Sequence, residues 1–417
     1  MTVEYVIIGN GVASVGAIEA IRQHDKKGGI TVFTDEEYPC YGRPLISYYL
    51  EGRAQPDNMN YRPKDFYKAN MVDLHLSEPV TKLDAAAHTV TAGGKQYSYD
   101  KLLVATGSSP FVPPTPGYDT VKDKFTFIRM SDALALAKKV KKRSRVLIIG
   151  AGLTGLKCAE GLYPRAGHIT VVDMADRVLP AVMDAEGANI VRKYLEGKGM
   201  EFHLGDSVAE YAGNVAHLKS DKDVEFDVLV TAVGVRPNTA LVAEAGGVTE
   251  TVLPNGRIMR GIVTNDDRST TLPDVYAAGD CSLSYDVTIE GVRPLAIQPN
   301  AYMQGETAGL AMCGAEVFKR EYLPVNAGGF LGLHIITAGS YDGEAITIAE
   351  DGNYHRFFVK DGRLVGFIEI GNYPRAGILT DMIRKRTPVA KVDFASLIKS
   401  PSLGALGMDY VRAVLKK

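Results

Sequence analysis

The 417-residue sequence has no excess of charge of either sign, because 47 lysines and arginines face 49 aspartates and glutamates and the formal net charge is -2. This balance argues against a protein that binds nucleic acid or an anionic membrane mainly by charge. No run of 18 apolar residues occurs, and the N-terminal MTVEYVIIGNG has glycines where a signal peptide needs a long apolar stretch. We therefore expect a soluble, unprocessed protein without a membrane span.

Cysteine is scarce and dispersed. The four cysteines, Cys40, Cys158, Cys281 and Cys313, form no CxxC or CxxxxC pair. This spacing argues against a disulfide scaffold, a clustered metal site and a vicinal redox-active disulfide, and it favours a reducing cytoplasm. The 8 histidines show no metal-binding spacing, and no Ser-His-Asp or HExxH pattern is present, so we expect neither a metal centre nor a hydrolase.

Two segments about 140 residues apart share one pattern, EYVIIGNGVAS at 4–14 and RVLIIGAGLTG at 145–155. In each, an apolar run typical of a strand buried in a parallel sheet leads into a glycine-rich turn and a helical stretch. The first glycine permits a tight bend, the second lets the backbone approach a pyrophosphate, and the helix N-terminus offers unpaired N–H groups. The pair predicts two dinucleotide sites, whereas either turn alone would also fit a purely structural role.

The third position of the turn is Ser14 in the first copy and Gly155 in the second, and we expect serine to fit if helix and strand lie slightly farther apart. Each copy continues into a second apolar strand that is followed by acid, Asp35 and Glu36 in the first copy and Asp173 in the second. A carboxylate at this place accepts hydrogen bonds from a ribose. Because Asp173 would repel a 2′-phosphate, the second site should prefer NADH to NADPH, unless Arg177 binds that phosphate.

Three further segments run from an apolar strand into small residues, LLVATG at 102–107, LVTAVG at 229–234 and DVYAAGD at 274–280. The first two follow the glycine turns at similar distances and predict paired return strands. The third ends in Asp280, and an aspartate at such a junction can hold a polyol chain. A helical stretch is expected from about 299 to 313.

Six segments of the chain, taken in order, resemble the FAD-dependent pyridine-nucleotide oxidoreductases of the glutathione-reductase-like fold. They are GNGVAS, DEEYPCYGRPLIS, LLVATGS, IIGAGLTG, VTAVGVRPN and VYAAGD. YGRPLIS and the C-terminal KDGRLVGFIEIGNYPRAGILTDMIR are most similar to NADH-rubredoxin and ferredoxin reductases and to the N-terminal part of the nitrite reductase large subunit. The resemblance covers nearly the whole chain. It implies an α/β fold with two Rossmann-like domains, an FAD domain at 1–118 and 249–320 and an NADH domain at 119–248, followed by a C-terminal α+β domain at 321–417.

The resemblance also implies which residues bind each cofactor. Those for FAD are Gly9, Gly11, Ser14, Glu36, Arg43, Pro44, Val80, Ala105, Thr106, Gly107, Asp280, Gln298 and Pro299. Those for NADH are Gly150, Gly152, Leu153, Thr154, Gly155, Asp173, Val233 and Gly234. The helix that starts at Gln298 would point its positive N-terminus at the side of the flavin ring where negative charge grows on reduction.

Two positions depart from the family pattern. Where the ferredoxin reductases have Pro-Pro-Leu-Ser-Lys after the arginine and Gly-Leu-Glu after the second glycine turn, this chain has Tyr48 and Lys157. We predict that Lys157 takes over the cationic role beside the flavin or the nicotinamide, with Tyr48 next to it. For an arbitrary helical lysine, an ordinary solvent-exposed position would be the safer expectation.

The resemblance implies an enzyme in which NADH reduces FAD by hydride transfer and electrons pass to a protein acceptor, such as rubredoxin, a ferredoxin-like iron-sulfur protein or a partner subunit. One alternative is a flavin-dependent reductase of a small disulfide or of oxygen that uses Cys40. Relatives with such a cysteine place it directly before a glycine, whereas here Tyr41 intervenes. Another alternative is an NADH-sensing flavoprotein without fast turnover. The acceptor and the oligomeric state stay open.

Overall fold

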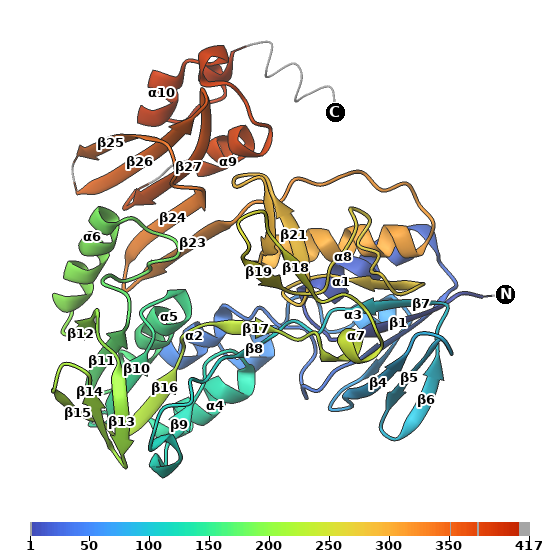
Figure 1. Ribbon diagram of the computed structural model, residues 1–417, viewed down its shortest axis with the longest axis horizontal. Coiled ribbons are helices and arrows are strands. Elements are labelled where there is room, and N and C mark those ends of the chain that lie inside the picture. Colours follow the sequence, from blue (N-terminus) through green and yellow to red (C-terminus); the bar gives the residue numbers. More distant parts are fainter. Residues whose placement is uncertain (1, 351, 373–374, 408–417) are drawn as a thin grey trace. The chain divides into compact units, whose positions relative to one another are not determined.

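The computed structural model describes residues 2–350, 352–372 and 375–407 (Figure 1). The predicted C-terminal domain therefore includes some residues outside the described ones, namely 351, 373–374 and 408–417. Contacts divide the chain into two compact units. Unit 1 comprises Met1–Arg43, Gln55–Ser109 and Val235–Tyr322, and unit 2 comprises Pro44–Ala54, Pro110–Gly234 and Leu323–Lys417. Within the described ranges, no helix is both long enough and apolar enough to cross a membrane.

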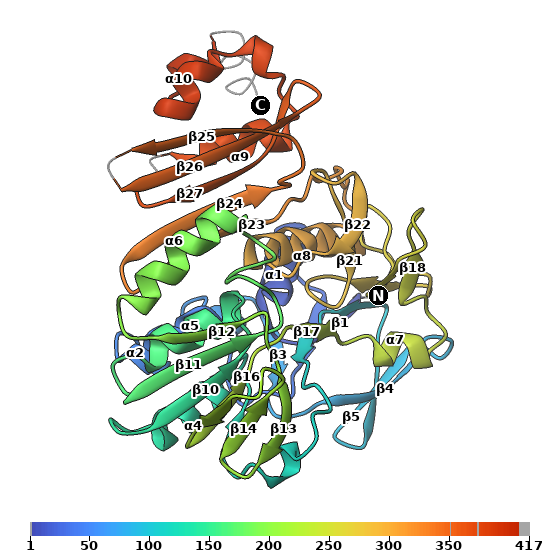
Figure 2. The ribbon, with the colours of Figure 1, turned by 60° about the vertical axis from the view of Figure 1, so that its left-hand side comes forward.

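Unit 1 is built on a parallel sheet with strand order β20-β7-β1-β2-β3. Its strands are β1 (Glu4–Ile8), β2 (Gly29–Phe33), β3 (Val72–His75), β7 (Lys101–Val104) and β20 (Val275–Ala277). Helices α1 (Val12–His24) and α8 (Gln298–Met312) lie side by side (Figure 2). They approach closely because glycines line their contact, and a Cβ atom at Gly305 would lie only 1.8 Å from the Ala13 carbonyl oxygen.

The other elements of unit 1 are short. An antiparallel sheet is formed by β4 (Val80–Asp84), β5 (Thr89–Ala92) and β6 (Lys95–Ser98). Two-stranded pairs are formed by β18 (Glu250–Val252) with β19 (Ile258–Arg260) and by β21 (Leu283–Asp286) with β22 (Gly291–Pro294). Strand β17 (Val235–Pro237) pairs with β8 (Ser108–Pro110). Unit 1 also contains the short helices α3 (Phe66–Ala69) and α7 (Ala240–Glu244) and a 3-10 helix at Pro56–Asn58.

Unit 2 contains a second parallel sheet, with strand order β12-β11-β10-β16-β9. Its strands are β9 (Lys124–Phe125), β10 (Arg145–Ile149), β11 (His168–Asp173), β12 (Glu201–Leu204) and β16 (Val228–Thr231). Its helices are α2 (Leu45–Glu51), α4 (Met130–Lys139), α5 (Leu153–Leu162) and α6 (Ala185–Glu196). A small antiparallel sheet is formed by β13 (Val208–Ala212), β14 (Val215–Leu218) and β15 (Asp223–Glu225). Four strands of the parallel sheet, β16-β10-β11-β12, repeat the order β7-β1-β2-β3 of the first sheet, whereas the fifth place is taken by β9, which comes first in the chain, and in the first sheet by β20, which comes last. The internal sequence repeat therefore corresponds to a repeated four-stranded core.

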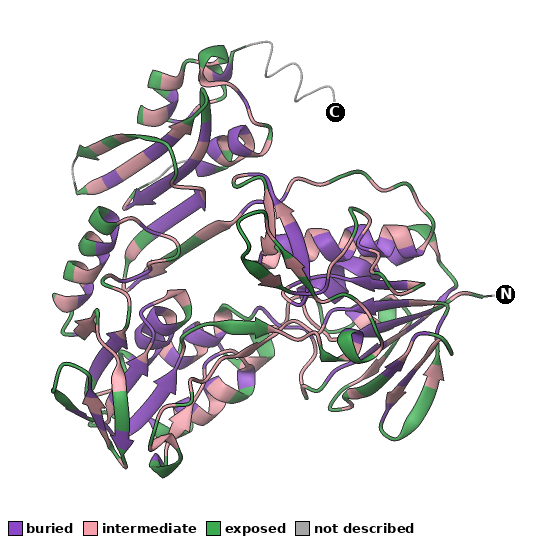
Figure 3. Cartoon of the chain, viewed as in Figure 1, coloured by how far each residue is buried: buried purple, intermediate pink, exposed green. Residues whose placement is uncertain are grey.

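The C-terminal part of unit 2 is a five-stranded antiparallel sheet with order β23-β24-β27-β26-β25. The strands are β23 (Val325–Phe330), β24 (Leu333–Gly339), β25 (Glu344–Glu350), β26 (Asn353–Lys360) and β27 (Arg363–Ile370). Helix α9 (Ala376–Arg384) packs on β24 and β27, and α10 (Phe394–Lys399) follows. Within this C-terminal sheet, many of the buried residues lie in β24 and β27 (Figure 3). The predicted fold class, two Rossmann-like sheets and a C-terminal α+β region, is confirmed.

Candidate functional site

The two glycine turns have the same geometry. Gly9 has φ +102° and Gly150 has φ +113°, a region that side chains rarely adopt. A Cβ at Gly9 would lie 2.2 Å from the Ala105 carbonyl oxygen, and one at Gly150 would lie 2.3 Å from that of Ala232. Both positions therefore require glycine, because each turn crosses closely over the end of the neighbouring strand.

The second glycine of each turn has a different role. Gly11 and Gly152 are the N-caps of α1 and α5, and neither helix start receives a hydrogen bond from a capping side chain. A Cβ at either glycine would meet no atom within 4 Å. The first N–H groups of both helices are thus open to a ligand, and a pyrophosphate is the anion that such turns bind.

Two buried amide groups in unit 1 also fit a ligand. The Nδ2 atom of Asn10, in the first turn, and the Nε2 atom of Gln298, at the start of α8, are buried without a hydrogen-bond partner among the described residues. Tyr67 orients Asn10, because its hydroxyl donates to Asn10 Oδ1 at 2.8 Å. Unpaired buried donors are rare in folded proteins, so these two amides support a bound group at the predicted FAD residues. Sequence reasoning missed Asn10, although it lies between Gly9 and Gly11.

The third position of the turn is filled in two ways. A Cβ at Gly155 would lie 1.9 Å from the Gly150 carbonyl oxygen, so only glycine fits in α5. In α1, Ser14 is fully buried and its hydroxyl donates to the Gly9 carbonyl at 2.6 Å. The serine thus replaces a close backbone contact with a hydrogen bond.

Asp173 lies at the end of β11, beside the second turn. Its carboxylate accepts hydrogen bonds from the N–H of Ala151 at 2.6 Å and from that of Ala175 at 2.8 Å. The side chain is held next to the glycine turn and stays partly accessible, which is the arrangement expected of a residue that receives a ribose. The binding of a ribose by Asp173 stays a prediction.

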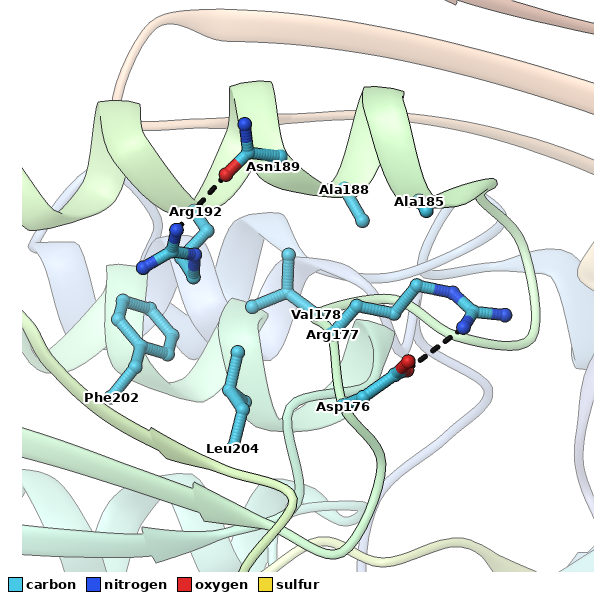
Figure 4. A pocket seen from close by; sticks show the side chains of 9 residues that line it. All are labelled: Asp176, Arg177, Val178, Ala185, Ala188, Asn189, Arg192, Phe202 and Leu204. Atoms are coloured by element: carbon cyan, nitrogen blue, oxygen red, sulfur yellow. Dashed lines mark hydrogen bonds and ion pairs between the residues drawn. The ribbon is translucent and has the colours of Figure 1, made fainter.

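A cavity of about 420 Å³ lies between β12, α6 and the loop after β11 (Figure 4). Arg177 lines it, and its guanidinium is paired with Asp176 at 2.8 Å. Arg192 lines the same cavity and is paired with Glu196 at 2.7 Å. Each cation therefore already has a carboxylate partner, although the Nε atom of Arg177 is buried without a hydrogen-bond partner among the described residues. The alternative that Arg177 binds a 2′-phosphate stays a prediction.

Two residues predicted to line the FAD dinucleotide contact each other. The Glu36 carboxylate is paired with the guanidinium of Arg43 and also accepts a hydrogen bond from the Tyr41 hydroxyl at 2.7 Å. The next residue, Pro44, is the N-cap of α2 and belongs to unit 2. A ribose would have to share Glu36 with Arg43 and Tyr41, contacts that the motif alone does not reveal.

The turn after β7 is held by a residue that sequence reasoning did not select. Asn238 donates from Nδ2 to the Thr106 carbonyl at 2.8 Å, and the Thr106 hydroxyl donates to the Asn238 carbonyl at 2.7 Å. The Asn238 N–H also donates to the Gly107 carbonyl at 2.9 Å. The sequence did offer one indication, because Asn238 is the last residue of the VTAVGVRPN motif. Of the other predicted residues, Val80 begins β4 and Val233 is 38% exposed at the equivalent turn of unit 2.

Asp280 follows β20 as predicted and lies in a buried setting. Burial raises the pKa of its carboxyl, while a hydrogen bond from Ser108 at 3.0 Å and the charge of Arg43 act in the opposite direction. The preceding Gly279 is fixed through its N–H, which donates to Gln304 Oε1 at 2.7 Å. The carboxyl has accepting capacity left, so it fits a ligand that offers hydroxyl groups.

Cys40 belongs to the apolar core of unit 1 and is only 5% exposed. Burial raises the pKa of its thiol to about 12. The thiolate is the reactive form of cysteine, so burial disfavours the reactive form of Cys40 near neutral pH. The alternative of a reductase that uses Cys40 is not favoured.

We expect Cys40→Ser to keep NADH-dependent reduction of an artificial one-electron acceptor within a few-fold of the parent, because that route needs no thiol. Steady-state assays normalised to flavin content measure this. A collapse of activity at unchanged flavin content would reinstate the cysteine-dependent alternative.

The structure brings Tyr48 and Lys157 together in unit 2. Helix α2 packs on α5 at Gly161, where a Cβ would lie 2.9 Å from Leu50 Cβ. As a result, the Lys157 ammonium lies 5.1 Å from the centroid of the Tyr48 ring, while Arg53 lies 4.5 Å from it. Both distances are within the range of a cation–π contact with a tyrosine ring. Sequence reasoning selected both residues but could not show that they meet.

Comparison with known proteins agrees with this geometry. The family described as pyridine nucleotide-disulphide oxidoreductase matches residues 3–305. The chain is 31% identical over 415 residues to nitrite reductase (NAD(P)H) of Bacillus subtilis (strain 168), covering 95% of this chain and 49% of that protein. It therefore spans about half the length of that relative. It is also 31% identical over 401 residues to the epsilon subunit of NADH-dependent phenylglyoxylate dehydrogenase of Aromatoleum evansii, covering 92% of both.

A solved structure shares the fold. The putidaredoxin reductase in the covalent complex with putidaredoxin superposes with a TM-score of 0.86 at 21% identity, covering 100% of this chain and 99% of that chain. The resemblance read from the motifs is confirmed. The chain belongs to the pyridine nucleotide-disulphide oxidoreductase family.

Proposed function

We propose that the chain is an FAD-dependent NADH oxidoreductase that passes electrons to a protein acceptor. One observation carries the proposal: the same strand, glycine turn and uncapped helix are built twice, once in each compact unit. Two dinucleotide sites in one chain suit a reaction between two dinucleotides. The named relatives support it, since one is an NAD(P)H nitrite reductase and another a subunit of an NADH-dependent dehydrogenase.

The two cofactors are assigned by the surroundings of each turn. Unit 1 would hold FAD, because Asp280 can accept from a ribityl chain and Asn10 and Gln298 offer buried amide donors. The uncapped start of α8 would place partial positive charge where the flavin gains negative charge. Bound FAD would supply the hydride-accepting ring.

Unit 2 would hold NADH. Gly150, Gly152 and the start of α5 would bind its pyrophosphate, and Asp173 would bind the adenosine ribose and disfavour a 2′-phosphate. The fold supplies orientation and fixed dipoles, which hydride transfer between two planar rings needs more than acid–base groups. The domains we propose are 1–118 with 249–320 for FAD, 119–248 for NADH, and 321–417.

The acceptor we propose is a redox protein, such as rubredoxin, a ferredoxin-like protein or an iron-sulfur partner subunit. The support is the relatives themselves, one of them named as a subunit of a larger dehydrogenase. We also propose a cytoplasmic location, because the cysteines described in the structure are free thiols, and three of them are buried.

The purified protein should be yellow, with FAD bound tightly but non-covalently. Anaerobic addition of NADH should bleach the flavin absorbance, and a one-electron acceptor should restore it. A colourless protein that gains no flavin spectrum on incubation with FAD would refute the proposal. A yellow protein that NADH bleaches but no electron acceptor reoxidises at a useful rate would favour the sensing alternative.

A further inference from the structure

Glu160 is a buried carboxylate on α5, one turn after Lys157. It is 5% exposed, and both of its oxygens are hydrogen-bonded. One oxygen accepts from the Lys157 ammonium, and the other accepts from the Leu331 N–H at 2.8 Å. A buried carboxylate needs such partners to compensate for its lost hydration. Glu160 therefore links the lysine to a turn of the C-terminal sheet.

The Lys157 ammonium is enclosed by further groups of unit 2. It donates to the Gly329 carbonyl at 3.3 Å and lies 5.9 Å from the centroid of the Phe330 ring, in addition to its contact with Tyr48. Only 22% of the lysine side chain is exposed. A lysine on a free helix surface keeps many rotamers, whereas this one is restricted by a carboxylate, a carbonyl and two rings.

The turn that Glu160 holds is strained. Leu331 has φ +51° and Gly332 has φ +96°, and together they join β23 to β24. A two-residue hairpin turn requires this left-handed backbone, which glycine adopts freely and leucine does not. The Leu331 peptide is held on both sides, because its carbonyl accepts from the Tyr194 hydroxyl of α6 at 2.8 Å. Strained residues held by surrounding structure are typical of functional sites.

We propose that Glu160 is a positioning residue that fixes the Lys157 ammonium near the rings of Tyr48 and Phe330 by anchoring it to the Leu331 turn. The inference rests on the proposed function and on the role predicted from the sequence, in which Lys157 is a cation beside the flavin or the nicotinamide. Because α5 begins directly after its N-cap Gly152, an ammonium immobilised on its second turn stays at a fixed distance from the predicted NADH pyrophosphate site. The sequence signal was available, since a lysine and a glutamate three residues apart on a helix are neighbours.

Glu160→Gln tests the positioning directly. Its amide oxygen can still accept the Leu331 N–H, while the charge that holds Lys157 is lost. In the FAD-loaded protein, acetylation of Lys157 by acetic anhydride, measured by peptide mass spectrometry, should become roughly tenfold faster, the factor expected for a lost charge-assisted hydrogen bond. Tyr194→Phe is the matched control, because it releases the other side of the same turn and should leave the labelling rate at the parent value. Equal labelling in the parent and Glu160→Gln would overturn the proposal.

Kinetics then separate this inference from the proposed function. We expect Lys157→Met to keep its FAD but to be reduced more slowly by NADH in stopped-flow bleaching, with the NADH dissociation constant measured alongside. If Glu160 acts through Lys157, the double variant will show the same defect as Lys157→Met alone. If the double variant instead slowed reduction by the product of the two single-variant factors, Glu160 and Lys157 would act independently and the inference would be wrong. A parent protein that NADH does not bleach would refute the proposed function and this inference with it.

Discussion

Gly11→Ala is expected to abolish FAD retention while leaving the protein folded. The backbone of Gly11 is extended, with φ −96°, and a Cβ there meets no protein atom within 4 Å, so alanine introduces no strain. The methyl group would instead occupy the space through which a pyrophosphate approaches the first N–H groups of α1. Loss of these charge-assisted hydrogen bonds should weaken FAD binding by roughly 100-fold or more. Flavin absorbance per polypeptide and titration of the apoprotein with FAD measure this.

Gly9→Ala is the contrasting variant. Its methyl group would lie 2.2 Å from the Ala105 carbonyl oxygen, on a residue with φ +102°. Strain and overpacking together should destabilise the fold by about 2–5 kcal/mol, seen as a lower thermal midpoint or as insoluble protein. In unit 2, Gly152→Ala should keep FAD and lose NADH binding. If Gly11→Ala retained FAD at the parent level, the first turn would not be the pyrophosphate site.

Asp173→Asn is expected to remove most of the preference for NADH over NADPH. The carboxylate is held beside the second turn by the N–H groups of Ala151 and Ala175, so its charge is fixed where a 2′-phosphate would lie. Loss of this repulsion should lower the ratio of kcat/KM for the two nucleotides by roughly 10- to 100-fold. Asparagine keeps one acceptor for these backbone groups, so the turn should survive.

Arg177→Ala is the matched control. Its guanidinium is paired with Asp176 and lines the cavity beside α6, so its removal should leave the selectivity unchanged. A parent protein that prefers NADPH, combined with loss of that preference in Arg177→Ala, would show that Arg177 binds the phosphate and that the prediction from Asp173 is wrong.

The fold could be predicted to a large extent because its signals are local. Continuous apolar runs identified β1 and β10, and the glycines that follow them are required by backbone conformations that other residues rarely adopt. The repeat at 4–14 and 145–155 correctly indicated strands of parallel sheets, and the two sheets share the order of four strands. The α+β character that the resemblance implied for the C-terminal part is also found, with β26 paired antiparallel to β27.

The site was predicted less completely, because its side chains meet across long stretches of sequence. The Glu36 motif gave no indication that Arg43 and Tyr41 share its carboxylate. Nor did any pattern place the Asn238 amide on the Thr106 turn. Such contacts depend on how segments pack, and local sequence carries no record of that packing.

The sequence by itself determined the two nucleotide turns and the family, since a tight bend and an open helix N-terminus depend on residues that are neighbours in the chain. Only the tertiary structure decided which candidates are reactive or restrained. It buried Cys40 and thereby raised the pKa of its thiol. It also enclosed Lys157 through Glu160 and Leu331, which lie 171 residues apart. Burial and charge pairing are properties of the packed chain, because they follow from the exclusion of water by segments that sequence order does not bring together.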